Sequence, residues 1–180
     1  MLPINDSTFW STWMQSPQVL DLSRRRRFTP ELKELFFSSL GLTAHSKMLD
    51  VGCGPGTFAR FLARYIEPPG LVFGLDKDGN FIAHARKQAE SEHVSDRVRY
   101  YVDDALILPF ENDAFDAVVS YTVIEHIPDT ARFISEQIRV CKPGGTVAAM
   151  GVMNSGKGSS TDGPIARGER YDALLAKLGK

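Results

Sequence analysis

The sequence has little of what marks a secreted, membrane-spanning or metal-stabilised protein. Its 180 residues include two cysteines, Cys53 and Cys141, which are too few for a disulfide framework and indicate a reducing compartment. No run of about 18 apolar residues predicts a transmembrane helix, and the N-terminus lacks the basic and apolar regions of a signal peptide. No group of Cys and His residues has the spacing of metal ligands. We therefore expect a cytoplasmic protein with no membrane partner and no metal.

The chain also lacks an excess of either charge, with 21 Lys and Arg against 22 Asp and Glu. A formal net charge of -1 gives it no general attraction to nucleic acid or to an anionic membrane. The exception is the run of four arginines at positions 24–27. This run is either a solvated turn, as most charge runs are, or an anion site at the mouth of a pocket. An anion site would favour a substrate that is RNA or that carries phosphate.

Short apolar segments alternate with helical patterns through the middle of the chain. This alternation is typical of an α/β fold, a doubly wound and mostly parallel Rossmann-like sheet with helices on both faces. The expected strands are residues 47–51, 71–75, 97–102, 114–120 and 146–153, and the expected helices between them are residues 57–66, 79–92 and 130–141.

The two ends of the chain do not follow this alternation. Residues 1–45 predict a helical cap segment, with a helix that starts near Pro30 and ends at Gly41. Residues 46–153 are the expected core. Residues 154–180 are rich in Gly, Ser and Lys and predict a flexible tail with a short helix at 171–178. One face of a further short helix near the N-terminus would consist of Phe9, Trp10, Trp13 and Met14.

The stretch that organises the core is residues 48–56, Met-Leu-Asp-Val-Gly-Cys-Gly-Pro-Gly. A strand, a turn of alternate glycines (Gly52, Gly54 and Gly56) and a helix make a nucleotide-binding corner, because glycines accept positive φ and let a ligand approach the backbone. The first turn of the helix presents unpaired N–H groups. Dinucleotide-binding dehydrogenases have the pattern G-x-G-x-x-G, so the spacing here disfavours a nicotinamide cofactor.

Acidic residues follow the second and third expected strands. Asp76, at the tip of the second strand, is placed to accept the two ribose hydroxyls of a nucleoside over the glycine turn. Its alternative role, a helix cap, suits Asp78 better, because Asp78 directly precedes a helix. Asp104, or failing that Asp103, is placed to accept from an exocyclic amine such as adenine N6. The alternative is that both are solvated loop carboxylates.

These motifs resemble the class I S-adenosylmethionine-dependent methyltransferases, and within them the small-molecule group that includes the ubiquinone and menaquinone biosynthesis enzymes. The resemblance covers roughly residues 40–153 and rests on five motifs in the family's order and spacing. They are Leu49-Asp-Val-Gly-Cys-Gly-Pro-Gly56, Gly74-Leu-Asp76, Asp104-Ala-x-x-Leu-Pro-Phe110, Ala114-Phe-Asp-Ala-Val-Val-Ser120 and Lys142-Pro-Gly-Gly145.

The resemblance implies S-adenosylmethionine as the methyl donor and S-adenosylhomocysteine as the product. It implies that the glycine turn holds the methionine part of the donor. Asp50 would lie under the turn and contact the donor's amino group, or else bond the turn's own N–H groups. The resemblance implies a donor site made of Asp50, Gly52, Cys53, Gly54, Gly56, Asp76, Lys77, Asp103, Asp104, Ala105, Ser120 and Tyr121.

The resemblance also implies how the acceptor is treated. The enzyme would hold a small molecule in line with the S–CH₃ bond, since the sulfonium methyl is already activated. His126 would be the base if the acceptor is a hydroxyl, with Glu125 orienting it, and its alternative role is packing at the start of a helix. No Asn-Pro-Pro-Tyr motif follows the fourth strand, as it does in many enzymes that methylate amino groups of DNA and protein.

The chain departs from the family at its C-terminal end. The family sheet has seven strands in the order 3-2-1-4-5-7-6, and this sequence supplies five, in the order 3-2-1-4-5, with no pattern for strands six and seven. We expect a chain without its C-terminal part, and a fifth strand with an open edge that the tail, residues 1–30 or a second copy covers. The open edge therefore allows a homodimer. The missing C-terminal part allows a second function, a domain that binds the donor but does not transfer its methyl group.

Overall fold

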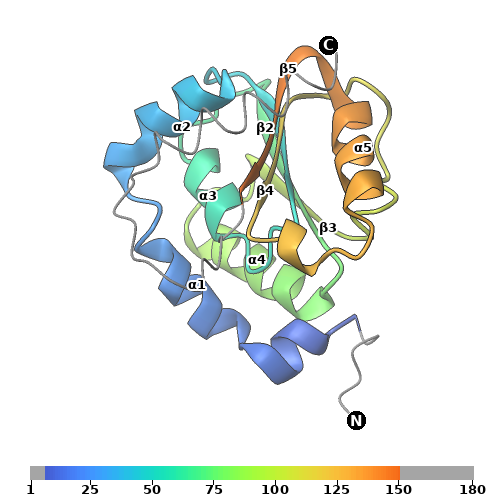
Figure 1. Ribbon diagram of the computed structural model, residues 1–180. Helices are drawn as coiled ribbons and strands as arrows, with labels where there is room; N and C mark the ends of the chain where they lie inside the picture. Colours follow the sequence, from blue (N-terminus) through green and yellow to red (C-terminus); the bar gives the residue numbers. More distant parts are fainter. Residues whose placement is uncertain (1–6, 151–180) are drawn as a thin grey trace, which may run out of the picture.

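The structure, a computed structural model, describes residues 7–150. Five parallel strands form one sheet in the order β3-β2-β1-β4-β5 (Figure 1), which confirms the predicted fold and strand order. The strands are β1 (Lys47–Val51), β2 (Leu71–Asp76), β3 (Val98–Val102), β4 (Phe115–Tyr121) and β5 (Cys141–Met150). Because β1 is central in the sheet, Met48, Leu49, Asp50 and Val51 are all buried, on one face or the other.

Helices cover both faces of the sheet, as the predicted doubly wound fold requires. They are α3 (Thr57–Ala63), α4 (Gly79–Ser91) and α5 (Thr130–Val140). Met48 belongs to the core on the side of α3 and α4, whereas the next residue, Leu49, belongs to the core that contains Phe133 of α5. Successive side chains of a strand point to opposite faces, so β1 supplies both cores. In Figure 1, α5 accordingly lies on the other side of the sheet from α3.

The fifth strand begins earlier than predicted. Lys142-Pro-Gly-Gly145 precedes the predicted strand at residues 146–153, but these residues lie inside β5. They form an irregularity in the pairing with β4, where Phe115 pairs with Cys141 and Ala117 pairs with Thr146. Gly144 has a φ of 78°, which explains why this bulge contains glycine. The last predicted strand residues, 151–153, lie outside the described residues.

The N-terminal part of the described chain is helical. It contains η1 (Trp10–Met14, a π-helix), α1 (Pro17–Arg25), η2 (Pro30–Leu32) and α2 (Lys33–Leu40). Gly41 ends α2 with a φ of 63°, as predicted. Thr29 precedes η2 without the side-chain hydrogen bond of a cap. These helices fall within the predicted cap segment, whose boundaries stay a prediction, and α1 packs against α3 and α4.

The predicted tail at residues 154–180, with its short helix at 171–178, lies outside the described residues. Between residues 7 and 150, no helix has the length and apolar character needed to cross a membrane. That same range contains no group of three or more His, Cys, Asp or Glu side chains arranged to hold a metal ion.

Candidate active site

Three glycines shape the turn between β1 and α3. Gly52, Gly54 and Gly56 have φ angles of 71°, 54° and 74°, in the left-handed region that other residues rarely adopt. The N–H groups of Gly52 and Cys53 both donate to the carbonyl of Leu75, over 2.7 and 3.0 Å. The turn is therefore fixed against the end of β2, and the predicted strand, turn and helix are present.

Gly56 also serves packing on the side of the turn away from β4. A Cβ atom at Gly56 would lie 2.6 Å from the Tyr100 hydroxyl and 2.8 Å from the Cβ of Ala85, on α4. The Tyr100 hydroxyl donates to the Gly56 carbonyl over 3.3 Å. Gly74 lies under the same ring, 2.7 Å from it at the Cβ position. Both glycines thus make room for one buried tyrosine, a role that the sequence motif does not reveal.

Side chains from distant segments reach the other two glycines. A Cβ atom at Gly52 would lie 2.5 Å from Val123, which follows β4. A Cβ atom at Gly54 would lie 3.1 Å from Nη1 of Arg24, on α1. The backbone of the turn is therefore approached from β4 and from the N-terminal helices. Cys53 is buried, and burial raises the pKa of its thiol, so it contributes its backbone and a neutral side chain.

Asp76 ends β2 with its carboxylate turned toward the glycine turn. Its Oδ2 accepts from the N–H of Gly54 over 2.8 Å, and its Oδ1 accepts from the N–H of Asp78 over 2.9 Å. Burial raises the pKa of Asp76 against these backbone hydrogen bonds, which lower it. Each carboxylate oxygen has a second lone pair for a ligand hydroxyl. The predicted ribose role of Asp76 stays a prediction.

Asp78 has the capping role that the sequence assigns to it. Its Oδ1 accepts from the N–H groups of Asn80 and Phe81 at the start of α4. It also accepts from the backbone and side chain of Ser11, over 2.9 and 2.8 Å. The cap of α4 therefore also fixes the N-terminal helices. Lys77, between the two acids, is exposed.

Two buried polar atoms at the ends of β1 and β4 have no hydrogen-bond partner among residues 7–150. They are Oδ2 of Asp50 and Oγ of Ser120, and both residues are about 1% exposed. Asp50 pairs with Val119 across the sheet, so the side chain of the next residue, Ser120, points to the opposite face. Burial raises the pKa of Asp50 to about 7, although the charge of Arg24 lowers it. Unsatisfied buried polar groups are costly, so the Asp50 carboxyl is a place for a polar ligand group.

The acids after β3 are exposed and bond locally. Oδ1 of Asp103 accepts from the N–H of Asp104, and Oδ1 of Asp104 accepts from the N–H of Leu106, both over 2.8 Å. The N–H of Asp103 donates to the carbonyl of Asp76, so this loop adjoins the end of β2. Ala105 is half-buried beside them. The structure brings these residues to the predicted edge of the sheet, and their adenine role stays a prediction.

The segment after β4 contains a strained residue. Thr122 has a φ of 56°, a conformation that is unfavourable for a β-branched side chain and is often found at functional sites. Its N–H donates to Met150 over 2.6 Å. Tyr121, just before it, packs its ring 5.5 Å from that of Phe28.

His126 is exposed, with its ring 4.4 Å from that of Trp10. A packing role for His126 is therefore present, and its catalytic role stays a prediction.

The four arginines at positions 24–27 have separate environments. Arg24 is directed at the glycine turn, and its Nη2 donates to Oγ1 of Thr122 over 2.9 Å. Arg27 lies 3.4 Å from the Tyr121 hydroxyl, whereas Arg26 is exposed. The anion-site alternative thus suits Arg24 and the solvated-turn alternative suits Arg26. The sequence shows a run of four arginines, but it does not indicate which of them faces the glycine turn and which faces solvent.

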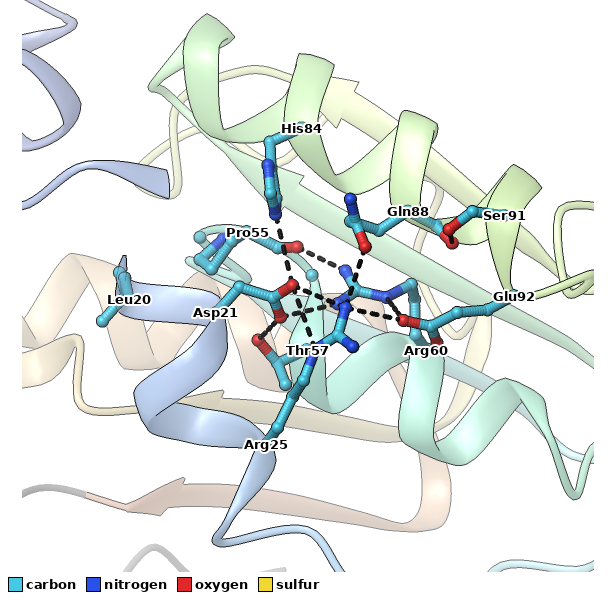
Figure 2. A network of polar contacts seen from close by, with 12 residues as sticks. Leu20, Asp21, Arg25, Pro55, Thr57, Arg60, His84, Gln88, Ser91 and Glu92 are labelled. Atoms are coloured by element: carbon cyan, nitrogen blue, oxygen red, sulfur yellow. Dashed lines mark hydrogen bonds and ion pairs between the residues drawn. The ribbon is translucent and has the colours of Figure 1, made fainter. Parts of the chain in front are cut away.

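A buried network of ion pairs attaches α1 to α3 and α4 (Figure 2). At its centre Asp21 accepts from Arg60 over 2.6 Å, from Thr57 over 2.7 Å and from Arg25 over 3.0 Å. Nε2 of His84 also lies 3.2 Å from Oδ2 of Asp21. Burial opposes the charge of Asp21, but the hydrogen bond from Thr57 and the charge of Arg60 lower its pKa overall. Sequence patterns did not predict this network, because its members are far apart in the chain.

Comparison with known proteins identifies the family. The family model described as a methyltransferase domain matches residues 49–149, more than half of the chain. This chain belongs to that methyltransferase family. Methyltransferase GfsG of Streptomyces halstedii is 30% identical over 97% of this chain and 66% of its own length. Demethylmenaquinone methyltransferase of Lactiplantibacillus plantarum is 31% identical over 63% of this chain and 48% of its own length.

Solved structures show a similar fold. A SAM-dependent methyltransferase from Aquifex aeolicus superposes with a TM-score of 0.66, at 18% identity, over 88% of this chain and 87% of its own. The 4+2 cyclase SpnF superposes with a TM-score of 0.59, at 30% identity, over 72% of this chain and 45% of its own. The chain thus spans less than two thirds of the length of several of its relatives, and one of the similar structures is named for a reaction other than methyl transfer.

The residues present fit the donor that the methyltransferase family implies. The unpartnered Oδ2 of Asp50 suits an ammonium group, and Gly52, Gly54 and Gly56 add no side chain of their own to the turn. The carboxylate of Asp76 is held at the other end of the turn. Hydrogen-bond acceptors for an amine and for hydroxyls, the carboxylates of Asp50 and Asp76, therefore lie beside one glycine turn.

Proposed function

We propose that this protein is an S-adenosylmethionine-dependent methyltransferase that acts on a small-molecule acceptor. The observation that carries the proposal is the buried Oδ2 of Asp50, which has no hydrogen-bond partner among residues 7–150, beside the glycine turn that Asp76 holds. A buried carboxylate oxygen without a partner is expensive in a folded protein, and the amino group of the donor would relieve that cost.

The chain's own residues would bind and orient the donor. The turn from Gly52 to Gly56 would receive the methionine part, and Asp76 the ribose hydroxyls. Asp103, Asp104 and the N–H of Ala105 would border the adenine, with Lys77 at the rim. When bound, S-adenosylmethionine supplies a methyl group that is already activated as a sulfonium.

The end of β4 would bring the donor and the acceptor together. Ser120 and Tyr121, at this end, would border the donor methionine and the transferring methyl, and the ring of Tyr121 packs among buried phenylalanines. Proximity and alignment of two reactants are worth on the order of 7–11 kcal/mol at best. For a hydroxyl acceptor, His126 would take the proton, with Glu125 orienting it.

Two relatives indicate the acceptor classes to test. One is the demethylmenaquinone methyltransferase described above, which suggests a quinone-like ring. The other is phosphoethanolamine N-methyltransferase 2 of Caenorhabditis elegans, 42% identical over 56% of this chain and 22% of its own length. A phosphate-bearing acceptor would suit the arginines at positions 24–27.

A second candidate function is donor binding without methyl transfer. The observation that favours it is the similarity to SpnF, a protein of this fold that is named as a cyclase. Under this alternative the glycine turn and Asp76 would bind the donor as described, and no methyl group would leave it.

Calorimetric titration with S-adenosylmethionine and, separately, with NADH tests the donor site. Micromolar binding of S-adenosylmethionine alone supports the proposal, and binding of NADH instead contradicts it. Transfer of a labelled methyl group is then measured with a naphthoquinol, with phosphoethanolamine and with RNA. Transfer to one of the small molecules supports the methyltransferase, transfer to RNA alone contradicts the small-molecule acceptor, and donor binding without any transfer favours the second candidate.

A further inference from the structure

Arg24 brings a positive charge from outside the matched methyltransferase domain to the glycine turn. Its Nη1 lies 3.1 Å from the Cβ position of Gly54, and its Nη2 donates to Thr122 over 2.9 Å. The guanidinium therefore spans from the turn to the segment after β4. The family match begins at residue 49, so family membership assigns nothing to residue 24.

The guanidinium of Arg24 is incompletely paired. Burial lowers its pKa, while the charges of Asp50 and Asp76 raise it. Between residues 7 and 150, no carboxylate lies within ion-pair distance of this guanidinium. A guanidinium has five N–H donors in a fork that matches a carboxylate, and the described hydrogen bonds use one of them. The site thus offers a carboxylate-binding group beside the turn.

Asp21 fixes the position of Arg24. The two residues are three apart on α1 and therefore lie on the same face of the helix. Asp21 is 3% exposed and is held by Thr57 and Arg60 of α3, the helix that follows the glycine turn (Figure 2). A change at Asp21 would let α1 shift relative to the turn, and the guanidinium would shift with it.

We propose that Arg24 binds the carboxylate at the amino-acid end of the donor, and that Asp21 is the positioning residue that aims it. The inference rests on the proposed function. It makes the protein selective for nucleosides that carry an α-amino acid over nucleosides that lack the carboxylate. It also makes α1 a part of the donor site. The carboxylate of the donor would face Arg24 on α1, and the ammonium of the donor would face Asp50 on β1.

The test compares two ligands that differ in the carboxylate alone, S-adenosylhomocysteine and its decarboxylated analogue. Calorimetry gives the ratio of their dissociation constants. The unsubstituted protein is expected to prefer S-adenosylhomocysteine by about 10-fold to 100-fold, the range for a charge-assisted hydrogen bond. Arg24→Met should bring this ratio near one by weakening S-adenosylhomocysteine alone. Arg26→Met, which removes an exposed arginine two positions away, should leave the ratio unchanged.

The outcomes separate this inference from the proposed function. Equal binding of both ligands by the unsubstituted protein overturns the carboxylate role and leaves the methyltransferase proposal standing. Equal weakening of both ligands by Arg24→Met overturns it too, since Arg24 would then be a counter-ion for Asp50 and Asp76. Failure of the unsubstituted protein to bind either ligand overturns the proposed function and this inference with it.

The positioning role of Asp21 needs a measurement that general destabilisation would not change. Asp21→Asn keeps the size of the side chain and should lower the ligand ratio while binding of the decarboxylated analogue stays constant. Thermal unfolding in parallel shows that the variant is folded. Thr57→Val removes one hydrogen bond to Asp21 and should lower the ratio in the same direction if Asp21→Asn does not fold. An unchanged ratio in a folded variant overturns the positioning role.

Discussion

The N–H of Gly54 donates to the carboxylate of Asp76 across 2.8 Å, which joins the middle of the glycine turn to the end of β2. The two residues are 22 positions apart, and each fixes the other's orientation. The acid is thus oriented before any ligand arrives, which lowers the entropic cost of binding. Two of the family's motifs form one structural unit here.

Replacing Asp76 should weaken donor binding. In Asp76→Ala the ribose hydroxyls lose their acceptor and the turn loses its anchor. We expect a loss of about 1–3 kcal/mol in binding free energy, the range for hydrogen bonds to charged groups. Calorimetry with S-adenosylhomocysteine measures the loss, and Asp96→Ala, at an exposed aspartate, is the control. Unchanged affinity in Asp76→Ala would mean that the ribose lies elsewhere.

Gly56→Ala should destabilise the fold through two effects that a control can separate. The alanine would need a φ of 74° and would meet the Tyr100 hydroxyl at 2.6 Å. Gly144 has a φ of 78°, and no atom of residues 7–150 lies within 4 Å of its Cβ position, so Gly144→Ala carries the backbone cost alone. We expect a loss of roughly 1–2 kcal/mol for Gly144→Ala and at least about 1 kcal/mol more for Gly56→Ala.

Urea unfolding measures both free energies. Equal losses in the two variants would show that Tyr100 moves aside without cost, contrary to this account of the packing. The double variant Gly56→Ala with Tyr100→Phe removes the hydroxyl contact and should recover part of the additional loss.

Donor affinity should depend on the ionisation of Asp50. Its pKa is raised from 3.8 to about 7 by burial, and the donor's ammonium prefers the ionised carboxylate. Affinity is therefore expected to increase from about pH 6 to about pH 8 and to level off above that. Asp50→Asn, measured by the same titration, should bind more weakly and lose this dependence. A pH profile that is identical in the two proteins would contradict the contact.

The raised pKa of Asp50 has the opposite effect on the stability of the fold. Asp50 keeps its proton in the folded protein at a pH where the unfolded chain has released it. The contribution of Asp50 to the free energy of unfolding should therefore decrease as the pH rises from about 4 to about 7, and stay constant above. Asp50→Asn should be less sensitive to pH in this window, which urea unfolding at several pH values would show.

Arg60 should be the arginine on which stability depends most in the network of Figure 2. It is 1% exposed and pairs with Asp21 and Glu92. Arg60→Met leaves Asp21 buried with one partner fewer, and such losses cost about 3–5 kcal/mol. Arg64→Met is the matched control, since the Arg64 side chain is 46% exposed and pairs with Glu92 alone, and it should cost at most about 1 kcal/mol. Similar losses in the two variants would contradict the central place of Arg60.

The open edge of β5 predicts association between copies of the chain. Among residues 7–150, β5 pairs with β4 and with no other strand, so one row of its backbone groups is available for pairing. Sedimentation velocity over a series of protein concentrations should show a dimer that increases with concentration. A monomer at every concentration would contradict the predicted homodimer.

The sequence by itself was sufficient for the sheet and the glycine turn. Buried parallel strands are continuous apolar runs, and alternate glycines require positive φ, so both are properties of neighbouring residues. The capping role of Asp78 followed in the same way from its place before a helix. The start of β5 was predicted wrongly, because a bulge that contains Pro and Gly has the local pattern of a turn.

Only the tertiary structure decided which distant side chains meet. Arg24 reaches Thr122 across 98 positions and Asp21 reaches Arg60 across 39, contacts that no local pattern specifies. The burial of Asp50 that raises its pKa also requires the assembled sheet, since desolvation depends on everything that packs around the carboxylate. The sequence thus determined the frame that can hold a nucleoside, and the packing of α1 on that frame decided which charges face it.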